Sequence, residues 1–157
     1  MKLSRLLSAP LIALAALACA GAHAQEPTGP QPPLAAVQLQ SGMYLIKAEV
    51  AKVEDTRMIG LMGRKQMAAN EGMLFLFPDL RQQCMWMKNT LLPLSVAFMD
   101  KDGVILNIED MKPQTEDSHC SVKPSPYALE MNLNWFKQKG LKAGSRITGL
   151  ERAGKAE

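Results

Sequence analysis

The apolar residues of this chain come in short runs separated by turn-forming residues, and this spacing constrains the fold more than any other feature. Residues 44–50 alternate between apolar and polar side chains, as half-buried strands do. Residues 73–77 form an apolar run that Pro78 ends, and Glu71-Gly72 before it reads as a turn. No long helical pattern and no internal repeat accompanies these runs, so the sequence predicts a chain built mainly of short strands.

Other segments extend this pattern to seven or eight strands. Asp102-Gly103 lies between two apolar runs, 94–99 and 104–108, which is a strong hairpin signal. Further strands are predicted at 37–40, 127–131 and 146–150. Two short helices are also predicted, one capped by Asp55 or Thr56 and one capped by Asn132 or Asn134. The fold class is therefore mostly β with a minor α component: a compact, largely antiparallel barrel-like or sandwich fold with two short helices at its edges.

The N-terminal 24 residues have the features of a secretory signal peptide. Lys2 and Arg5 precede a short apolar stretch, and Ala22-His23-Ala24 matches an A-x-A cleavage site. Because the apolar stretch is too short to span a bilayer, we expect cleavage after Ala24, no stable membrane anchor, and a periplasmic or secreted protein. The predicted organisation is a signal peptide at 1–24, a disordered Pro-rich leader at 25–36, a single β-rich domain at 37–151 and a charged tail at 152–157.

Cys84 and Cys120 are the two cysteines that remain after cleavage. In an oxidising compartment such a pair is most simply a disulfide, which would stabilise the fold by roughly 3–4 kcal/mol on the chain-entropy model. A redox pair is the weaker alternative, because the C-x-x-C spacing of thiol oxidoreductases is absent. Free or metal-binding thiols are the third interpretation.

Charge and histidine content argue against several functional classes. Without Lys2 and Arg5, the 18 basic residues fall to 16 against 15 acidic ones, so the basic excess typical of nucleic-acid binders is missing. His119 is the one histidine left once His23 is removed, which rules out a multi-histidine zinc or iron site within one chain. Nucleophile-elbow and phosphate-binding glycine motifs are also absent. We expect no nucleic-acid partner, no metal site of this kind and no cofactor.

Two stretches, GLMGRKQMAANEGMLFLFP and WMKNTLLPLSVAFMDKDGVILNI, resemble the family called domain of unknown function 192, and the resemblance extends over about residues 44–150. It implies a small β-rich, barrel-like fold and no established activity. At Ser95 and Ser145 the family usually has aspartate, so we expect no carboxylate chemistry at either position. The matching positions are Gly60, Leu61, Met62, Arg64, Glu71, Gly72, Met73, Phe75, Trp86, Met87, Lys88, Asn89, Thr90, Pro93 and Glu130.

The stretch CMWMKNTLLP, residues 84–93, is the candidate site. A period of two places Met85, Met87, Asn89 and Leu91 on one side and Cys84, Trp86, Lys88 and Thr90 on the other. The second side combines an aromatic ring, a cation and a hydroxyl, so it can line a shallow pocket. A purely structural interpretation is equally concrete: Trp86 covers the disulfide, Lys88 pairs with Glu130 or Glu71, and Asn89 and Thr90 fix the turn before Pro93.

The functional prediction is non-enzymatic binding of a small ligand or a protein partner. The predicted ligand-binding residues are Trp86, Lys88 and Thr90, with Asn89, Glu130 and Arg64 near the rim. The polar loop 109–125, which holds His119, is a candidate lid.

Two alternatives come from other functional classes. An enzyme would use Glu71, Glu130, Lys88 and Tyr127 as acid–base groups. A Cu(I) carrier would use methionine thioether and cysteine thiolate sulfurs, above all the thioethers of Met85 and Met87, although methionines at core spacings usually fill gaps.

Overall fold

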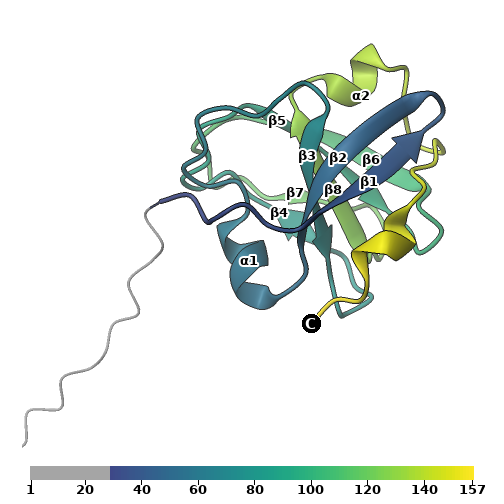
Figure 1. Ribbon diagram of the computed structural model, residues 1–157, viewed down its shortest axis with the longest axis horizontal. Helices are drawn as coiled ribbons and strands as arrows, with labels where there is room; N and C mark the ends of the chain where they lie inside the picture. The colour runs from purple at the N-terminus through teal and green to yellow at the C-terminus, as the bar shows by residue number, and fades with distance from the viewer. Residues whose placement is uncertain (1–28) are drawn as a thin grey trace, which may run out of the picture.

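Residues 29–157 are described by a computed structural model of the chain (Figure 1). The predicted signal peptide lies outside the described residues, as does the first part of the predicted leader. The described part of the leader lies against the domain, because the buried side-chain amide of Gln31 donates to the carbonyl oxygens of Thr56 at 3.1 Å and Gly60 at 2.8 Å. The disorder predicted for 25–36 therefore does not extend to Gln31.

Within residues 29–157, eight short strands form two sheets, which confirms the mostly β prediction. The larger sheet has the order β1-β2-β3-β8-β5-β6, and the smaller one pairs β4 with β7. The bounds are β1 Ala36–Ser41, β2 Tyr44–Ala51, β3 Glu71–Leu76, β4 Cys84–Met85, β5 Leu94–Met99, β6 Ile105–Met111, β7 His119–Cys120 and β8 Tyr127–Asn132.

One pair of neighbouring strands is parallel. The chain leaves β2, passes through the short helix α1 (Glu54–Ile59) and returns as β3 alongside β2. This crossover was not predicted. The Glu71-Gly72 turn was also predicted wrongly, because both residues belong to β3. Gly72 is needed there for a different reason: a Cβ atom at this position would lie 2.4 Å from the backbone oxygen of Glu130 in the neighbouring strand β8.

The hairpin predicted at Asp102-Gly103 is confirmed between β5 and β6. The Asp100 carboxylate accepts hydrogen bonds from the backbone N–H groups of Asp102 and Val104, each at 2.9 Å. Gly103 has a φ of 77°, which glycine adopts without the steric penalty of a side chain.

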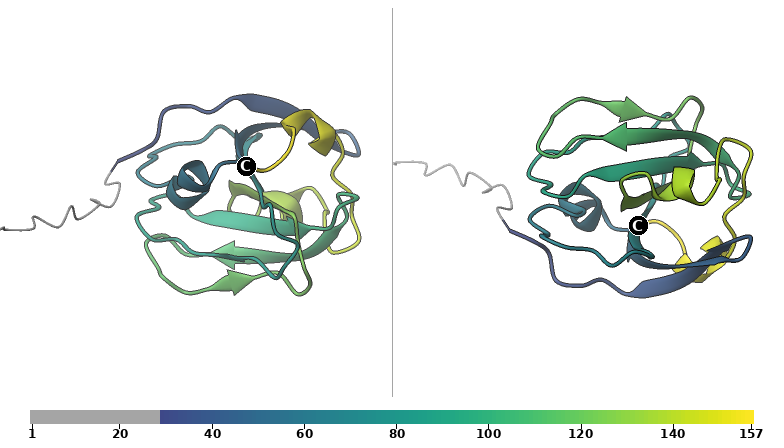
Figure 2. Two further views of the ribbon diagram at one scale, coloured as in Figure 1. Left: turned by 90° about the horizontal axis from the view of Figure 1, so that it is seen from below. Right: turned by 90° about the horizontal axis from the view of Figure 1, so that it is seen from above.

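The larger sheet curls strongly but is not closed into a barrel, so the sandwich-like alternative describes it better (Figure 2). The segment 144–148 runs between the two sheet edges: the Thr148 N–H donates to the carbonyl oxygen of Gln40 in the edge strand β1, and the Ile147 N–H donates to that of Gly103, just before the other edge strand, β6. The strand predicted at 146–150 is replaced by isolated bridges and a short 3₁₀ helix, η1 (Leu150–Ala153).

The two faces of the sheet carry two separate hydrophobic clusters. Along β3, Leu74 and Leu76 belong to the first cluster, while Met73 and Phe75 belong to the second. The first cluster lies inside the curl and includes residues of α2 (Trp135–Gln138) and η1. The second lies on the outer face of β3, β8 and β5, and residues from the segments after α1 and around β4 complete it. The candidate site lies on this second face.

The helix starts differ from the predicted caps. Asp55 and Thr56 lie inside α1, whose N-cap is Val53. Asn134 does occupy the N-cap of α2, but in a left-handed conformation and without a side-chain cap. Neither α-helix of the described chain, nor η1, has the length and apolarity needed to cross a bilayer.

Candidate functional site

Residues 84–91 change direction at Asn89, and this turn decides which side chains reach the interior. The predicted alternation holds as far as Lys88, with the two methionines buried and Trp86 44% exposed. Asn89 has a φ of 56°, and the pattern shifts there. Asn89 and Leu91 are exposed, whereas Thr90 is buried. The prediction that Asn89 and Leu91 face the core and Thr90 faces outward is therefore wrong.

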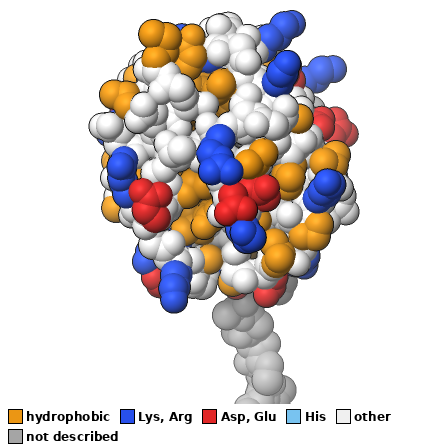
Figure 3. All heavy atoms as spheres, turned by 90° about the vertical axis from the view of Figure 1, so that its right-hand side faces the viewer, with side chains coloured by type: hydrophobic (Ala, Val, Ile, Leu, Met, Phe, Trp, Pro, Cys, Tyr) orange, Lys and Arg blue, Asp and Glu red, His pale blue; other side chains and the backbone are white. Residues whose placement is uncertain are grey.

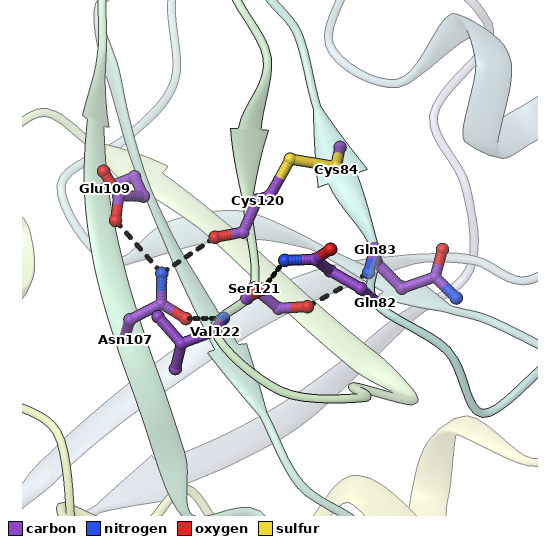
Figure 4. The surroundings of a disulfide bond; sticks show 8 residues. All are labelled: Gln82, Gln83, Cys84, Asn107, Glu109, Cys120, Ser121 and Val122. Carbon is purple, nitrogen blue, oxygen red and sulfur yellow. Dashed lines mark hydrogen bonds between the residues drawn. A yellow bond between two sulfur atoms is a disulfide. The ribbon is translucent and has the colours of Figure 1, made fainter.

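The predicted disulfide is present. Cys84 and Cys120 stand directly opposite each other in β4 and β7 and are bonded through their sulfurs. Two hydrogen bonds anchor the same loop on either side (Figure 4): the Asn107 amide donates to the Cys120 carbonyl at 3.0 Å, and the Ser121 hydroxyl accepts the Gln83 N–H at 3.0 Å. The middle of the predicted lid loop is thus fixed to its neighbours. Whether any part of it acts as a lid stays a prediction.

Glu130 is the most unusual residue on the second face. It lies in β8 between Met73 of β3 and Val96 of β5, both fully buried, and its own residue is only 3% exposed. No hydrogen bond or ion pair within residues 29–157 reaches its carboxyl. Because no fully enclosed side-chain polar atom of these residues lacks a partner, the carboxyl oxygens must open onto the cavity that Glu130 lines. Burial raises the pKa of Glu130 to about 8. The carboxyl therefore holds its proton at neutral pH, because ionisation in apolar surroundings is costly.

The Glu130 side chain lines a small cavity, which we call the Glu130 cavity. It offers about 20 Å³ of room for the centre of a water-sized group, enough for one such group but far less than the several hundred Å³ of a drug-sized pocket. Thr90 and Trp86 line it as well, so three of the six predicted ligand-binding residues meet here. The remaining lining residues come from α1, the turn after it, β3 and β4: Arg57, Met58, Ile59, Gly60, Leu61, Met62, Phe75 and Met85.

The wall formed by the end of α1 depends on a glycine and on the leader. Gly60 has a φ of 51°, and a Cβ atom there would come within 3.2 Å of the Phe75 ring. Its carbonyl oxygen accepts the hydrogen bond from the Gln31 amide already described. Sequence reasoning placed 60–62 within the family pattern but gave no reason to assign these residues to the site.

Trp86 and Lys88 lie together outside the buried part of the cavity. The Lys88 ammonium is 5.5 Å from the centre of the Trp86 ring, which is a cation–π distance. Thr90 follows, and its hydroxyl faces the Lys88 carbonyl at a long 3.4 Å. Of the partners proposed for Lys88 in the structural interpretation, Glu71 pairs with Lys47 at 3.0 Å.

Arg64 and Asn89 do not line the cavity. The Arg64 guanidinium makes two hydrogen bonds to the Glu49 carboxylate, at 2.5 and 2.6 Å. Burial alone would raise the pKa of Glu49, but the bonds from Arg64 and from the Leu34 N–H outweigh it, and the pKa is lowered. Asn89 contributes its carbonyl oxygen, which accepts the Gly63 N–H at 2.9 Å. Both residues therefore support the surrounding loops and do not line the Glu130 cavity.

The methionines that meet at the cavity are not the predicted pair. Met85 lines it, but Met87 is fully buried and does not. Met58 and Met62 do line it. The pattern that could have found them is the spacing of four residues around the end of α1, which the sequence analysis interpreted as core packing.

The comparisons with other proteins identify a family but no activity. The family model of domain of unknown function 192, described as "Uncharacterized ACR", matches residues 37–149. None of the curated proteins matches the chain.

Two solved structures share the fold. A protein of Sinorhizobium meliloti 1021, described provisionally as a transcription regulator, is 35% identical with a TM-score of 0.72, covering 76% of this chain and 98% of that one. A protein of unknown function from Novosphingobium aromaticivorans DSM 12444 is 29% identical with a TM-score of 0.69, covering 73% and 86% of the two chains.

Proposed function

This chain belongs to the domain of unknown function 192 family, and we propose that it is a non-enzymatic binding protein that takes a small ligand, or the tip of a partner's side chain, into the Glu130 cavity. We place this activity in the periplasm or outside the cell, after signal peptide cleavage behind Ala24. The observation that carries the proposal is the Glu130 carboxyl, which is buried, faces a cavity and has no partner in the described part of the chain.

A carboxyl this deeply buried with no hydrogen bond from the described chain is costly, and natural proteins satisfy nearly all such groups. The Glu130 oxygens open onto the cavity, so their partner has to come from a group within it. The flanking strands offer only Met73 and Val96 at this point, and both are apolar. A leucine or methionine in place of Glu130 would pack there without leaving a polar group unsatisfied. A ligand that donates a hydrogen bond or brings a positive charge would give the carboxyl the partner that the protein does not.

The size and walls of the cavity restrict the ligand. About 20 Å³ of room admits an ion or one small polar end group. Met58 and Trp86, which are 58% and 44% exposed, line the same cavity and give it an apolar approach from solvent. Such a site fits the end of a slender ligand or side chain and excludes a bulky organic molecule.

An enzyme is the second candidate, and the pKa of Glu130 near 8 favours it, because a group that titrates near neutrality suits general acid–base catalysis. We rank it second because Glu130 is the one carboxyl among the described lining residues and no imidazole joins it. The acid–base partners suggested by sequence do not meet it here: Glu71 is engaged by Lys47.

We do not extend the regulator description of the Sinorhizobium protein to nucleic-acid binding. The predicted mature chain is close to neutral, and over most of the face shown in Figure 3 basic and acidic side chains are interspersed. A phosphate-binding surface needs clustered Lys and Arg.

Native mass spectrometry tests the proposed function. The protein is purified from the periplasm without chelator or reductant, alongside Glu130→Gln and a control, Glu151→Gln, whose side chain is 73% exposed. We expect a ligand mass on the wild-type protein and on the control that is lost from Glu130→Gln. An unliganded wild-type protein, or a ligand mass that survives Glu130→Gln, would contradict the proposal.

A further inference from the structure

We propose that the Glu130 cavity is a binding site for one soft monovalent metal ion, Cu(I), with the thioether sulfurs of Met58, Met62 and Met85 as its ligands. This inference rests on the proposed binding function and names the class of ligand.

The donor set is the first support. Thioether sulfurs are soft, weakly basic ligands that select Cu(I) over the harder divalent ions. Met58 lies in α1, Met62 in the turn after it and Met85 in β4, so the fold brings two separate segments of the chain to one cavity. No group of three or more His, Cys, Asp or Glu side chains that could hold a harder metal exists in residues 29–157.

Core packing accounts for several methionines of this chain, including Met85, which belongs to the second cluster, and the buried Met62, but it does not account for Met58. Met73, Met87, Met99 and Met131 are fully buried in the two hydrophobic clusters, where methionine fills gaps. Met58 is 58% exposed and still lines the cavity. Met58 therefore places one thioether sulfur of the cavity lining on a side chain that solvent reaches.

Charge and size agree with a monovalent ion. A single positive charge in a site of low dielectric needs a counter-charge. Glu130 is the one carboxyl among the described lining residues, and it supplies that charge by releasing its proton to solvent as the ion binds. The other charged lining residue, Arg57, directs its guanidinium to the backbone carbonyls of Lys52, Leu76 and Glu157. The room in the cavity, about 20 Å³, suits one ion.

Trp86 also lines the site, and its fluorescence can report whether an ion is bound there. Its ring lines the cavity and already accepts the Lys88 ammonium at 5.5 Å, so its face is able to interact with a cation. The other tryptophan, Trp135, belongs to the first cluster on the opposite face of the sheet. A Cu(I) ion in the cavity should therefore quench the fluorescence of Trp86 and leave that of Trp135 unchanged.

The test is anaerobic competition for Cu(I) against bicinchoninate, with ascorbate as reductant so that the disulfide stays intact. Met58→Leu, Met62→Leu and Met85→Leu are compared with two controls, Met87→Leu in the core and Met43→Leu, which is 82% exposed in the β1–β2 turn. Met-to-Leu exchanges nearly conserve volume and should each cost less than about 1.5 kcal/mol of folding stability, which urea unfolding checks.

We expect one Cu(I) per chain, a loss of affinity of about tenfold or more for each of the three cavity variants, and wild-type affinity for both controls. Ag(I), a redox-inactive analogue, should shift the methyl NMR signals of Met58, Met62 and Met85 but not that of Met87. No binding, an equal loss in Met87→Leu, or unchanged binding after all three exchanges would overturn the inference. If Cu(I) fails to bind while native mass spectrometry shows an organic ligand that requires Glu130, the inference falls and the proposed function stands.

Discussion

At the scale of single residues, Glu130 is the clearest exception to the tendency of buried polar groups to have a partner within the protein. The partly buried Arg64 and Glu49, by contrast, pair with each other. Sequence reasoning named Glu130 as a site residue, because the family pattern includes it. The same reasoning could not show that its neighbours in β3 and β5 are apolar, since strand order is a property of the whole sheet.

Glu130 should make the stability of the protein depend on pH between about 4.5 and 8. Its pKa is about 8 in the folded protein against 4.5 in the unfolded chain, so the folded protein binds the proton more tightly. This contribution to stability is fully present below pH 4.5 and is lost as the pH rises to 8, at about 1.4 kcal/mol per pH unit within the window. Urea unfolding of wild type and Glu130→Gln at several pH values measures the difference, which should shrink or reverse in favour of Gln as the pH rises.

An exposed carboxyl provides the control for this series. Glu71→Gln removes a surface ion pair with Lys47 but leaves Glu130 unchanged. The stability of the Glu71→Gln variant should decrease as the pH rises from 5 to 8, in parallel with that of the wild type. A constant difference between wild type and Glu130→Gln across that range would mean that Glu130 is solvated or paired in solution.

At the scale of elements, the site depends on how closely β3 and β8 approach. The strands were predictable from their apolar runs and turn residues, and the hairpin at Asp102-Gly103 was found from two residues. The parallel pairing of β2 with β3 was not, because a short helix broken at Gly60 gives no sequence signal for the strand that follows it. Gly72 was interpreted as a turn for the same reason: its role is contact with β8, which lies far away in sequence.

Gly72→Ala should destabilise the protein by about 1–3 kcal/mol or more, because its Cβ atom would lie 2.4 Å from the Glu130 backbone oxygen and 2.4 Å from the Met131 sulfur. Gly29→Ala is the matched control, since nothing lies within 4 Å of a Cβ atom there. Chemical denaturation of both variants measures the effect. Equal stabilities of the two variants would show that β3 and β8 are farther apart than described.

The disulfide should supply a large part of the local stability around the site. Strands β4 and β7 have two residues each, so their backbone pairing alone is weak. Replacing Cys84 and Cys120 together by Ser should cost about 3–4 kcal/mol in unfolding free energy. Reduction should destabilise the wild type by a similar amount and leave the double variant unchanged. A reductant effect on the double variant would show that the loss has another origin.

At the scale of the whole molecule, the fold was largely predictable and the site only in part. Composition, cysteine count and the Trp-Met-Lys-Asn-Thr string indicate a β-rich domain with one disulfide, and both are present. Trp86, Thr90 and Glu130 do line one cavity, but Arg64 and Asn89 support loops. The methionines that line this cavity are Met58, Met62 and Met85, whereas Met85 and Met87 were predicted as a pair. These errors share one cause: the turn at Asn89 and the crossover through α1 shift side chains between faces, and no local pattern records such shifts.

The central claim is that Glu130 is a buried, protonated carboxyl that faces the cavity and has no hydrogen-bond partner among residues 29–157. The most direct measurement is the side-chain carboxyl ¹³C chemical shift of Glu130, followed by NMR from pH 4 to pH 10 in the oxidised, metal-free protein. We expect a titration midpoint near pH 8. A midpoint near 4.5, the ordinary value for glutamate, would mean that water or a partner reaches the carboxyl and would contradict the site described here.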